Sequence, residues 1–232
     1  MTSVHTSRDF ETELRELRAH ALAMGTRCER SVKLAVMAFC HDEHQLTVEV
    51  EAIDAKLDRD EVDLHALVLR ILALRQPVAA DLRFLAAALK LITDLERIGD
   101  EAVNIAERSV GVNGSAKSLV QNELASMTDE VQDMLHGALT AFVDGDAERA
   151  NRVLESDDAV DRHCGAIIAQ MSDYIAKHSD DVSAGLRVVR VAKHLERIAD
   201  HATNVAEEVI FMVRGDDVRH ARSCALLPPY RR

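Results

Sequence analysis

The sequence predicts an all-α protein built as two tandem antiparallel three-helix bundles, with six long helices produced by an internal duplication. Three observations predict this class. The 232 residues include only nine Gly and three Pro, and aromatic residues make up 3% of the chain, which leaves few turns for a sheet-based architecture. Apolar residues recur at alternating steps of four and three over long stretches, as they do along one face of an α-helix. A fourteen-residue segment of the first half recurs in the second half.

The first half of the chain predicts three helices. The first begins at Thr6, which is followed three residues later by an acid in the manner of an amino-terminal cap, and it ends in the polar cluster 41–44. The second ends just before Pro77, because proline disfavours helical geometry in the residue that precedes it. Pro77 is expected in the first turn of the third helix, which runs to about Ser109.

The second half repeats this plan. Residues 111–114 are rich in Gly and Asn and predict a linker, after which Ser115 is expected to cap the fourth helix. The chain breaks again at 144–146, and residues 179–181 open the sixth helix. Beyond Arg214 the apolar periodicity is lost, which predicts a tail.

The repeat itself fixes the predicted domains. Residues 94–107 align with residues 194–207, and nine of the fourteen positions are identical. A weaker match places Ile53 over Val160 in the preceding helix of each half. Because breaks recur regularly and the connections are short, antiparallel bundles are favoured over one elongated coiled coil. The predicted units are residues 1–112, 113–214 and a carboxyl-terminal tail of residues 215–232.

The charge and the apolar pattern exclude several classes of partner. Lys and Arg number 28 against 40 Asp and Glu, a formal net charge of −12, which disfavours nucleic acid and anionic membranes. No apolar run approaches a signal-peptide core or the roughly 18–20 residues of a membrane span, so a cytoplasmic protein without membrane insertion is expected. The four cysteines form no CxxC pair and are interpreted as reduced thiols, and Cys28 and Cys164 occupy apolar-stripe positions expected to be buried.

The repeated segment carries acids and amides on one side of its helix. At 100° per residue these side chains fall within roughly an 80° arc that borders the apolar face. The preceding helix of each half adds a further carboxylate. The candidate oxygen-ligand sets are Glu96, Asp100, Asn104 and Glu107 with Asp54, and Glu196, Asp200, Asn204 and Glu207 with Asp161.

Two cationic partners for these acids remain open. Like charges at i and i+4 disfavour the helix slightly, so a cation among them is expected. A metal held by carboxylate and amide oxygens would be Mg²⁺, Mn²⁺, Ca²⁺ or iron in preference to Zn²⁺. The alternative is surface ion pairing with Arg97 and Arg197, which lie in the same segments. His194 and His201 project from the opposite side of the helix and are expected at the surface.

No motif for catalysis or cofactor binding is found in the chain. The patterns GxxxxGK[ST], GxGxxG, GxSxG and HExxH do not occur, so nucleotide binding, serine hydrolysis and zinc proteolysis have no local support. The Glu-x-x-His tetrapeptide of helical di-iron enzymes does not occur either. No catalytic residue is therefore assigned from these patterns.

Four segments, in this order, closely resemble the PhoU family of phosphate-transport accessory proteins. They read RQPVAADLR at 75–83, LERIGD at 95–100, LERIAD at 195–200 and FMVRGDDVRH at 211–220. The resemblance spans about residues 8 to 220. It implies two tandem three-helix bundles in a cytoplasmic, usually dimeric protein that is not an enzyme. Such a protein negatively regulates the phosphate-starvation response and phosphate uptake. The partners it implies are the ATPase subunit of the phosphate ABC transporter and the sensor histidine kinase of the phosphate regulon.

The resemblance also implies a metal motif, since some members bind metal through Glu/Asp-x-x-x-Asp on the bundle surface. This spacing is matched by Glu96 with Asp100, by Glu196 with Asp200, and by Asp157 with Asp161. The cofactor it implies is a divalent metal or an iron cluster, with Fe, Mn, Mg or Zn as candidates. Two other functions stay open: a carboxylate-metal protein that hydrolyses or sequesters phosphate compounds, and a purely structural helical module.

Overall fold

The structure is a computed structural model that describes residues 3–41, 43, 45–109, 114–216 and 218. Within these ranges the chain forms helices and no strands, which confirms the predicted all-α class. Each half contributes three long helices joined by short connections. They are α1 (Ser3–His41), α2 (Gln45–Arg75), α3 (Ala79–Glu107), α4 (Gly114–Asp144), α5 (Ala147–Lys177) and α6 (Val182–Arg214).

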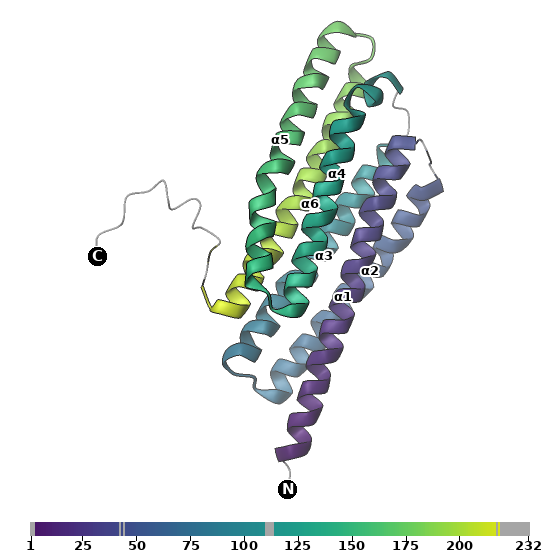
Figure 1. Cartoon of the computed structure of the whole chain (residues 1–232). Coiled ribbons are helices and arrows are strands. Elements are labelled where there is room, and N and C mark those ends of the chain that lie inside the picture. Colours follow the sequence, from purple (N-terminus) through teal and green to yellow (C-terminus); the bar gives the residue numbers. More distant parts are fainter. Residues whose placement is uncertain (1–2, 42, 44, 110–113, 217, 219–232) are drawn as a thin grey trace, which may run out of the picture.

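The six helices form two antiparallel three-helix bundles that lie side by side (Figure 1). Helices α1, α2 and α3 pack on one another, and so do α4, α5 and α6. The two bundles meet where α3 packs on α6 and α1 packs on α4. Among the described helices, α2 touches only α1 and α3, and α5 touches only α4 and α6. Helices α2 and α5 are therefore the outer helices of the molecule.

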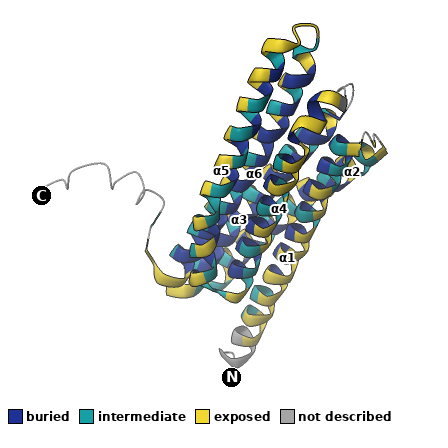
Figure 2. Cartoon of the chain, turned by 45° about the horizontal axis from the view of Figure 1, so that its top comes forward, coloured by how far each residue is buried: buried dark blue, intermediate teal, exposed yellow. Residues whose placement is uncertain are grey.

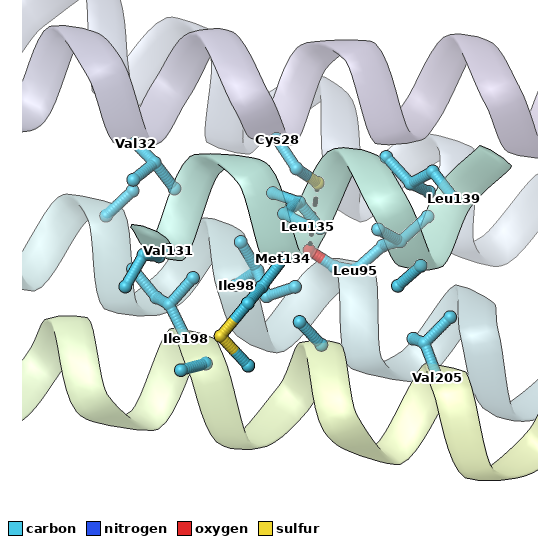
Figure 3. Close-up of a cluster of buried hydrophobic side chains, with 14 of the residues drawn as sticks. Cys28, Val32, Leu95, Ile98, Val131, Met134, Leu135, Leu139, Ile198 and Val205 are labelled. Atoms are coloured by element: carbon cyan, nitrogen blue, oxygen red, sulfur yellow. Dashed lines mark hydrogen bonds between the residues drawn. The ribbon is translucent and has the colours of Figure 1, made fainter. Parts of the chain in front are cut away.

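One continuous apolar core runs through both bundles, and exposed residues follow the outer sides of the helices (Figure 2). Figure 3 shows Val32 of α1, Ile98 of α3, Val131 of α4 and Ile198 of α6 converging in this core. The Cys28 thiol is buried there and donates a hydrogen bond to the Leu95 carbonyl at 3.2 Å (Figure 3). Because the core is shared, the bundles are packed together as well as linked by the chain.

Several helix ends differ from the sequence prediction. Helix α1 begins at Ser3, so Thr6 lies inside the helix and not at its cap. Pro77 precedes the α3 amino-terminal cap residue, Val78, so its predicted place in the first turn was wrong. Ser115 likewise lies within α4, which begins at Gly114. The predicted end of the first helix is confirmed, since α1 stops at His41.

The ends of α5 and α6 follow recognised capping chemistry. The Asp146 carboxylate accepts hydrogen bonds from the backbone N–H groups of Glu148 and Arg149, at 3.0 and 2.9 Å, which satisfies donors that the first turn leaves free. Asp181 precedes α6 at the end of the predicted opening segment 179–181, and its carboxylate accepts a hydrogen bond from the Tyr174 hydroxyl at 2.6 Å in place of capping the helix. Gly215 ends α6 at φ 78°, a left-handed conformation that glycine adopts without strain.

Some predictions fall on residues outside the described ranges. The boundary between residues 112 and 113 is one of them, as are most of the linker 111–114, most of the tail 215–232, and Cys224. Cys28, Cys40 and Cys164 form no disulfide within the described residues, and the thiols of Cys28 and Cys164 are buried as expected. Searched over the described residues, the helices include none with an apolar stretch of the length that a bilayer requires.

Candidate functional site

Carboxylates of α2 and α3 gather on one side of the first bundle. We call Asp54, Asp58, Glu61, Glu96 and Asp100 the first acidic face. Burial, together with the negative charges of Asp58 and Asp100, raises the pKa of Asp54 to about 6. Its Oδ1 atom is buried and has no hydrogen-bond partner in the described structure. A buried carboxylate oxygen without a partner is costly, so this position fits a bound cation or proton.

Gly99 allows α2 and α3 to approach closely behind the first acidic face. A Cβ atom at this position would lie 2.6 Å from Leu57 Cδ1 and 2.9 Å from Asp54 Oδ1, both closer than side chains can pack. The second half carries Ala199 at the equivalent position, so the corresponding helices there cannot pack in the same way. The two acidic faces therefore differ in geometry despite their similar sequences.

The second acidic face lies between α5 and α6 and consists of Asp161, Glu196 and Asp200. Burial, and after it the charges of Glu196 and Asp161, raises the pKa of Asp200. Burial and the same two acids raise the pKa of the neighbouring Cys164 thiol to about 11, so this thiol is protonated at neutral pH. Lys193 Nζ lies 2.5 Å from Glu196 Oε2, which gives this face a cation of its own.

Ion pairs with nearby basic side chains balance part of the negative charge on both acidic faces. Arg97 Nε lies 3.5 Å from Glu96 Oε2, and burial next to Asp100 raises the pKa of Glu96 although Arg97 opposes the shift. Arg197, which was expected to serve the second face, instead contacts Glu101 of the other bundle. The first face has a partly exposed arginine and a buried oxygen without a partner, whereas a lysine neutralises part of the second. A metal therefore fits the first face better than the second.

The structure does not bring Asn104 and Glu107 of α3 into the first acidic face. The Asn104 amide donates to the Asp100 backbone carbonyl at 3.0 Å, and the Asn104 carbonyl accepts from Arg108. Glu107 is exposed at the end of α3. On α5, Asp157 is half-buried one turn before Asp161. Asn104 and Glu107 therefore lie along the same helix as Glu96 and Asp100 without adding to the first acidic face.

Asn204 and Glu207 face α3 of the first bundle and not the α5–α6 side. The Asn204 amide donates to Asp94 Oδ1 at 3.4 Å. Both residues line a groove of about 630 Å³ between α2, α3 and α6, which Leu69 and Lys90 also line. Their predicted membership of one cluster with Glu196 and Asp200 was wrong, because α6 is contacted on several sides and its polar arc is divided between two neighbours.

A polar joint between the bundles was missed by the sequence analysis. We call the pairs Glu101–His194 and Asp94–His201 the interbundle joint. The His194 ring donates a hydrogen bond from Nδ1–H to the carboxylate oxygen Oε2 of Glu101, and both side chains are largely buried. Arg197 Nη1 lies 3.4 Å from the other Glu101 oxygen. His194 is therefore not the surface residue that the sequence analysis expected.

The second pair of the joint is related to the first by the internal duplication. His201 Nδ1 lies 2.8 Å from Asp94 Oδ1, and His201 is half-buried. In the alignment of the repeats, Asp94 lies over His194 and Glu101 lies over His201. The first half thus supplies both acids and the second half both imidazoles. This exchange was the signal in the sequence that could have predicted the joint.

The acidic faces offer oxygen ligands but no complete metal site. Within the described residues, no three or more His, Cys, Asp or Glu side chains are arranged to hold a metal ion. The donor set and the unpartnered Asp54 oxygen nevertheless suit a hard cation at the first face. Fold and surface together define a class: a duplicated helical-bundle protein whose candidate sites are open charged faces of its helices.

The chain belongs to the PhoU family. The family model of the PhoU domain matches residues 21–109 and again residues 124–209, which agrees with the two bundles. The chain is 38% identical over 219 residues to the phosphate-specific transport system accessory protein PhoU homolog of Pseudomonas putida, covering 93% of this chain and 85% of that protein. It is 35% identical over 219 residues to the homolog of Caulobacter vibrioides, covering 94% and 95% of the two chains.

Solved structures of the family share the fold. The crystal structure of PhoU from Pseudomonas aeruginosa superposes with a TM-score of 0.84 at 36% identity, and the match covers 89% of this chain and all of that one. The structure of the phosphate transport system regulatory protein PhoU from Streptococcus pneumoniae gives a TM-score of 0.83 at 25% identity, covering 90% and 99% of the two chains. The prediction of this family and of its six-helix fold is confirmed.

Proposed function

We propose that this protein is a cytoplasmic regulatory adaptor of phosphate homeostasis. It negatively regulates the phosphate-starvation response and phosphate uptake by linking the ATPase subunit of the phosphate ABC transporter to a sensor histidine kinase. We also propose that it acts as a homodimer and carries out no catalysis. The observation that carries the proposal is the match to phosphate-specific transport accessory proteins over more than nine-tenths of the chain.

The surface of the molecule supports an adaptor. Its helices expose large apolar side chains, among them Val62 and Leu69 on α2 and Leu119 on α4, on surfaces open to partners. The candidate acidic faces are likewise open and border helix α2 or α5, the outer helices. A protein that works by binding needs such accessible faces, whereas catalysis requires converging groups around a substrate.

The mechanism of such an adaptor is differential binding. To silence a kinase, the adaptor must bind its inactive state more tightly than its active state, since a ligand with equal affinity for both shifts nothing. Moving the kinase from almost fully active to almost fully inactive requires a preference of about 10⁴-fold, or about 5.5 kcal/mol. The long helical surfaces provide room for contacts of that total strength.

Capture of the tagged protein from its own host tests the proposal. Cells are grown with abundant and with limiting phosphate, and the retained proteins are identified by mass spectrometry. We expect the transporter ATPase subunit and the sensor kinase, with more of the kinase retained when phosphate is abundant. Retention of neither protein in either condition would overturn the adaptor function and favour a structural module.

The first acidic face supports a second proposal, a bound divalent metal or iron cluster. The unpartnered oxygen of Asp54, between the carboxylates of Asp58 and Asp100, is the observation that favours it. Glu96, Asp100 and Asp54 would hold the metal, whose positive charge would offset their mutual repulsion. On the second face Lys193 already supplies a positive charge, so weaker binding is expected there.

Elemental analysis of protein purified without chelator tests this metal proposal. Fe, Mn, Mg and Zn are measured in the wild type, in Glu96→Ala, in Glu196→Ala and in the double variant, with Glu107→Ala as the matched exposed control. We expect Glu96→Ala to lose most of the metal and the control to keep it. Negligible metal in the wild type, or equal metal in all variants, would refute the site. Phosphate release from model phosphoesters by the metal-loaded protein would instead support hydrolysis.

A further inference from the structure

Helix α2 carries an apolar stripe on the side that faces away from the core. Its buried residues, from Val50 to Ile71, lie on one side of the helix, and the stripe lies on the opposite side. The stripe positions are spaced alternately by four and three residues, and all are exposed. We call them the α2 seam: Val48, Ala52, Ala55, Arg59, Val62, Ala66, Leu69 and Ala73.

The α2 seam is more apolar than is expected for a helix surface that only contacts water. Val48, Val62 and Leu69 are 67%, 66% and 59% exposed, and seven of the eight seam residues are apolar. No described helix covers it, since α2 touches only α1 and α3. A sustained spacing of four and three with apolar side chains is the pattern of a coiled-coil interface. The small alanines would allow two helices to approach at about 8 Å.

The duplicated half provides an internal comparison. When Ile53 is placed over Val160, the seam falls on an outward stripe of α5. That stripe carries charge at Glu155, Arg162 and Asp173, whereas the α2 seam carries it only at Arg59. Both stripes belong to outer helices with the same fold, so the fold does not require the apolar character of α2. An additional contact at α2 explains it.

The charges beside the seam identify what binds there. Along one flank, at intervals of seven residues, lie Glu49, Lys56, Asp63 and Arg70. Their signs alternate along the helix. When a second α2 runs antiparallel, Lys56 lies opposite Asp63 of the second copy and Glu49 lies opposite Arg70 of the second copy, and each pair occurs twice by symmetry. The flank is therefore complementary to itself.

The same alternation excludes other alignments. A shift by one heptad places Asp63 opposite Asp63 of the second copy, or Lys56 opposite Lys56 of the second copy. A parallel pair brings Asp58 of one copy against Asp63 of the other. Like charges at these flanking positions disfavour a coiled-coil pairing. The central layers of the favoured alignment pair Arg59 with Val62 of the second copy, and a single polar seam residue of this kind helps to fix the register.

We infer that the α2 seam is a homodimer interface in which two copies of the chain pair antiparallel through α2. The body of each molecule lies mainly on the opposite side of α2, so pairing leaves the second acidic face outside the interface (Figure 1). Asp58 of the first acidic face flanks the seam, and Leu69 borders the groove that α2 forms with α3 and α6. The inference rests on the homodimer of the proposed function and specifies the surface, direction and register of that contact. Single charge-reversal variants that dimerise as wild type does would overturn the α2 seam and leave the homodimer standing. It holds or fails independently of any phosphate-transport partner.

Sedimentation velocity on purified full-length chain tests the inference with two single charge reversals. In the Lys56→Glu homodimer, the new glutamate faces Asp63 of the second copy, so two negative charges oppose each other. In the Asp63→Lys homodimer, the new lysine faces Lys56 of the second copy, so two positive charges oppose each other. Each variant alone is expected to dimerise at least about tenfold more weakly than wild type. Mixed in equal amounts, the two variants restore both central ion pairs, so the heterodimer is expected to form with close to wild-type affinity. Lys56 and Asp63 are exposed, so the circular dichroism spectrum is expected to be unchanged.

The matched control is Arg162→Glu on the outer stripe of α5, which is expected to leave the dimer unchanged. A second variant, Val62→Glu, places a charge in the seam and is expected to abolish the dimer without unfolding the chain. A wild-type chain that is monomeric at about 50 μM would overturn the inference. So would single variants that dimerise as the wild type does, or a mixture that stays monomeric.

Discussion

Replacement of Glu101 by alanine is expected to lower the free energy of unfolding by about 2–3 kcal/mol. The Glu101 side chain is 14% exposed and hydrogen-bonds to His194, whose side chain is 9% exposed. A hydrogen bond to a charged group contributes about 1.5–3 kcal/mol, and its removal leaves the buried imidazole without this partner. The Arg197 pair adds less than about 1 kcal/mol, because its guanidinium is 59% exposed.

Urea unfolding at pH 7 measures this change, and a double-mutant cycle with His194→Ala isolates the contact. The coupling energy of the two substitutions is expected to be about 1–2 kcal/mol, as for hydrogen-bonded neighbours. Glu107→Ala, an exposed acid on the same helix, is the control and is expected to change stability by less than about 0.5 kcal/mol. A coupling energy near zero would refute the view that the pair stabilises the contact between the bundles.

The pH dependence of this difference is a further part of the same test. Burial by itself raises the pKa of Glu101, but the hydrogen bond and charge of His194, with the charge of Arg197, outweigh burial, and the pKa is lowered below 4.5. The folded protein then binds fewer protons here than the unfolded chain. The stabilisation is therefore present above about pH 4.5 and is lost as the pH falls through the lowered pKa. The stability difference between wild type and Glu101→Ala is expected to shrink in that acidic range.

Two other substitutions probe the first acidic face. Gly99→Ala is expected to destabilise the protein by about 1–3 kcal/mol, because the added Cβ would lie 2.6 Å from Leu57 Cδ1. Gly165→Ala is the control and is expected to be neutral or slightly stabilising, because no atom lies within 4 Å of its added Cβ. Equal melting temperatures for the two variants would contradict this prediction. Asp54→Asn is expected to stabilise metal-free protein by about 1–2 kcal/mol at pH 8, because burial and Asp58 raise the folded pKa of Asp54 to about 6 from 3.8. The cost of ionising Asp54 in the folded protein develops between about pH 4 and pH 6 and is fully present above pH 6. That gain should vanish below about pH 4 in urea titrations with chelator, and a gain independent of pH would be inconsistent with the raised pKa.

The fold was predictable because long helices with a regular apolar stripe leave few alternatives. The positions of the helix ends were less predictable. Gln76 and Ala79 have φ values of 50° and 48°, and neither is a residue type that signals a left-handed conformation. They delay the start of α3 beyond Pro77, which sequence rules place in the first turn. The local conformation of this connection depends on how α2 and α3 pack, and spacing in the sequence does not record that.

The site was predictable only in part, for a geometric reason. The periodicity of one helix shows which residues share a side, and it correctly grouped Glu96 with Asp100 and Glu196 with Asp200. It does not show which neighbour each side contacts. Helix α6 packs against α3, α4 and α5, so an arc of 80° that reads as one face in the sequence is divided between two neighbours, and Asn204 joins Asp94 across the bundles.

The interbundle joint also determines how the two halves could pair if they were separate chains. Two copies of the first half, packed as the halves are here, would place Asp94 against Glu101, while two copies of the second half would place His194 against His201. Only the mixed pairing puts an acid next to an imidazole. The two halves therefore favour each other as partners. If the chain were cut between them, the first half should bind the second half in preference to a second copy of itself, and the same should hold for the second half.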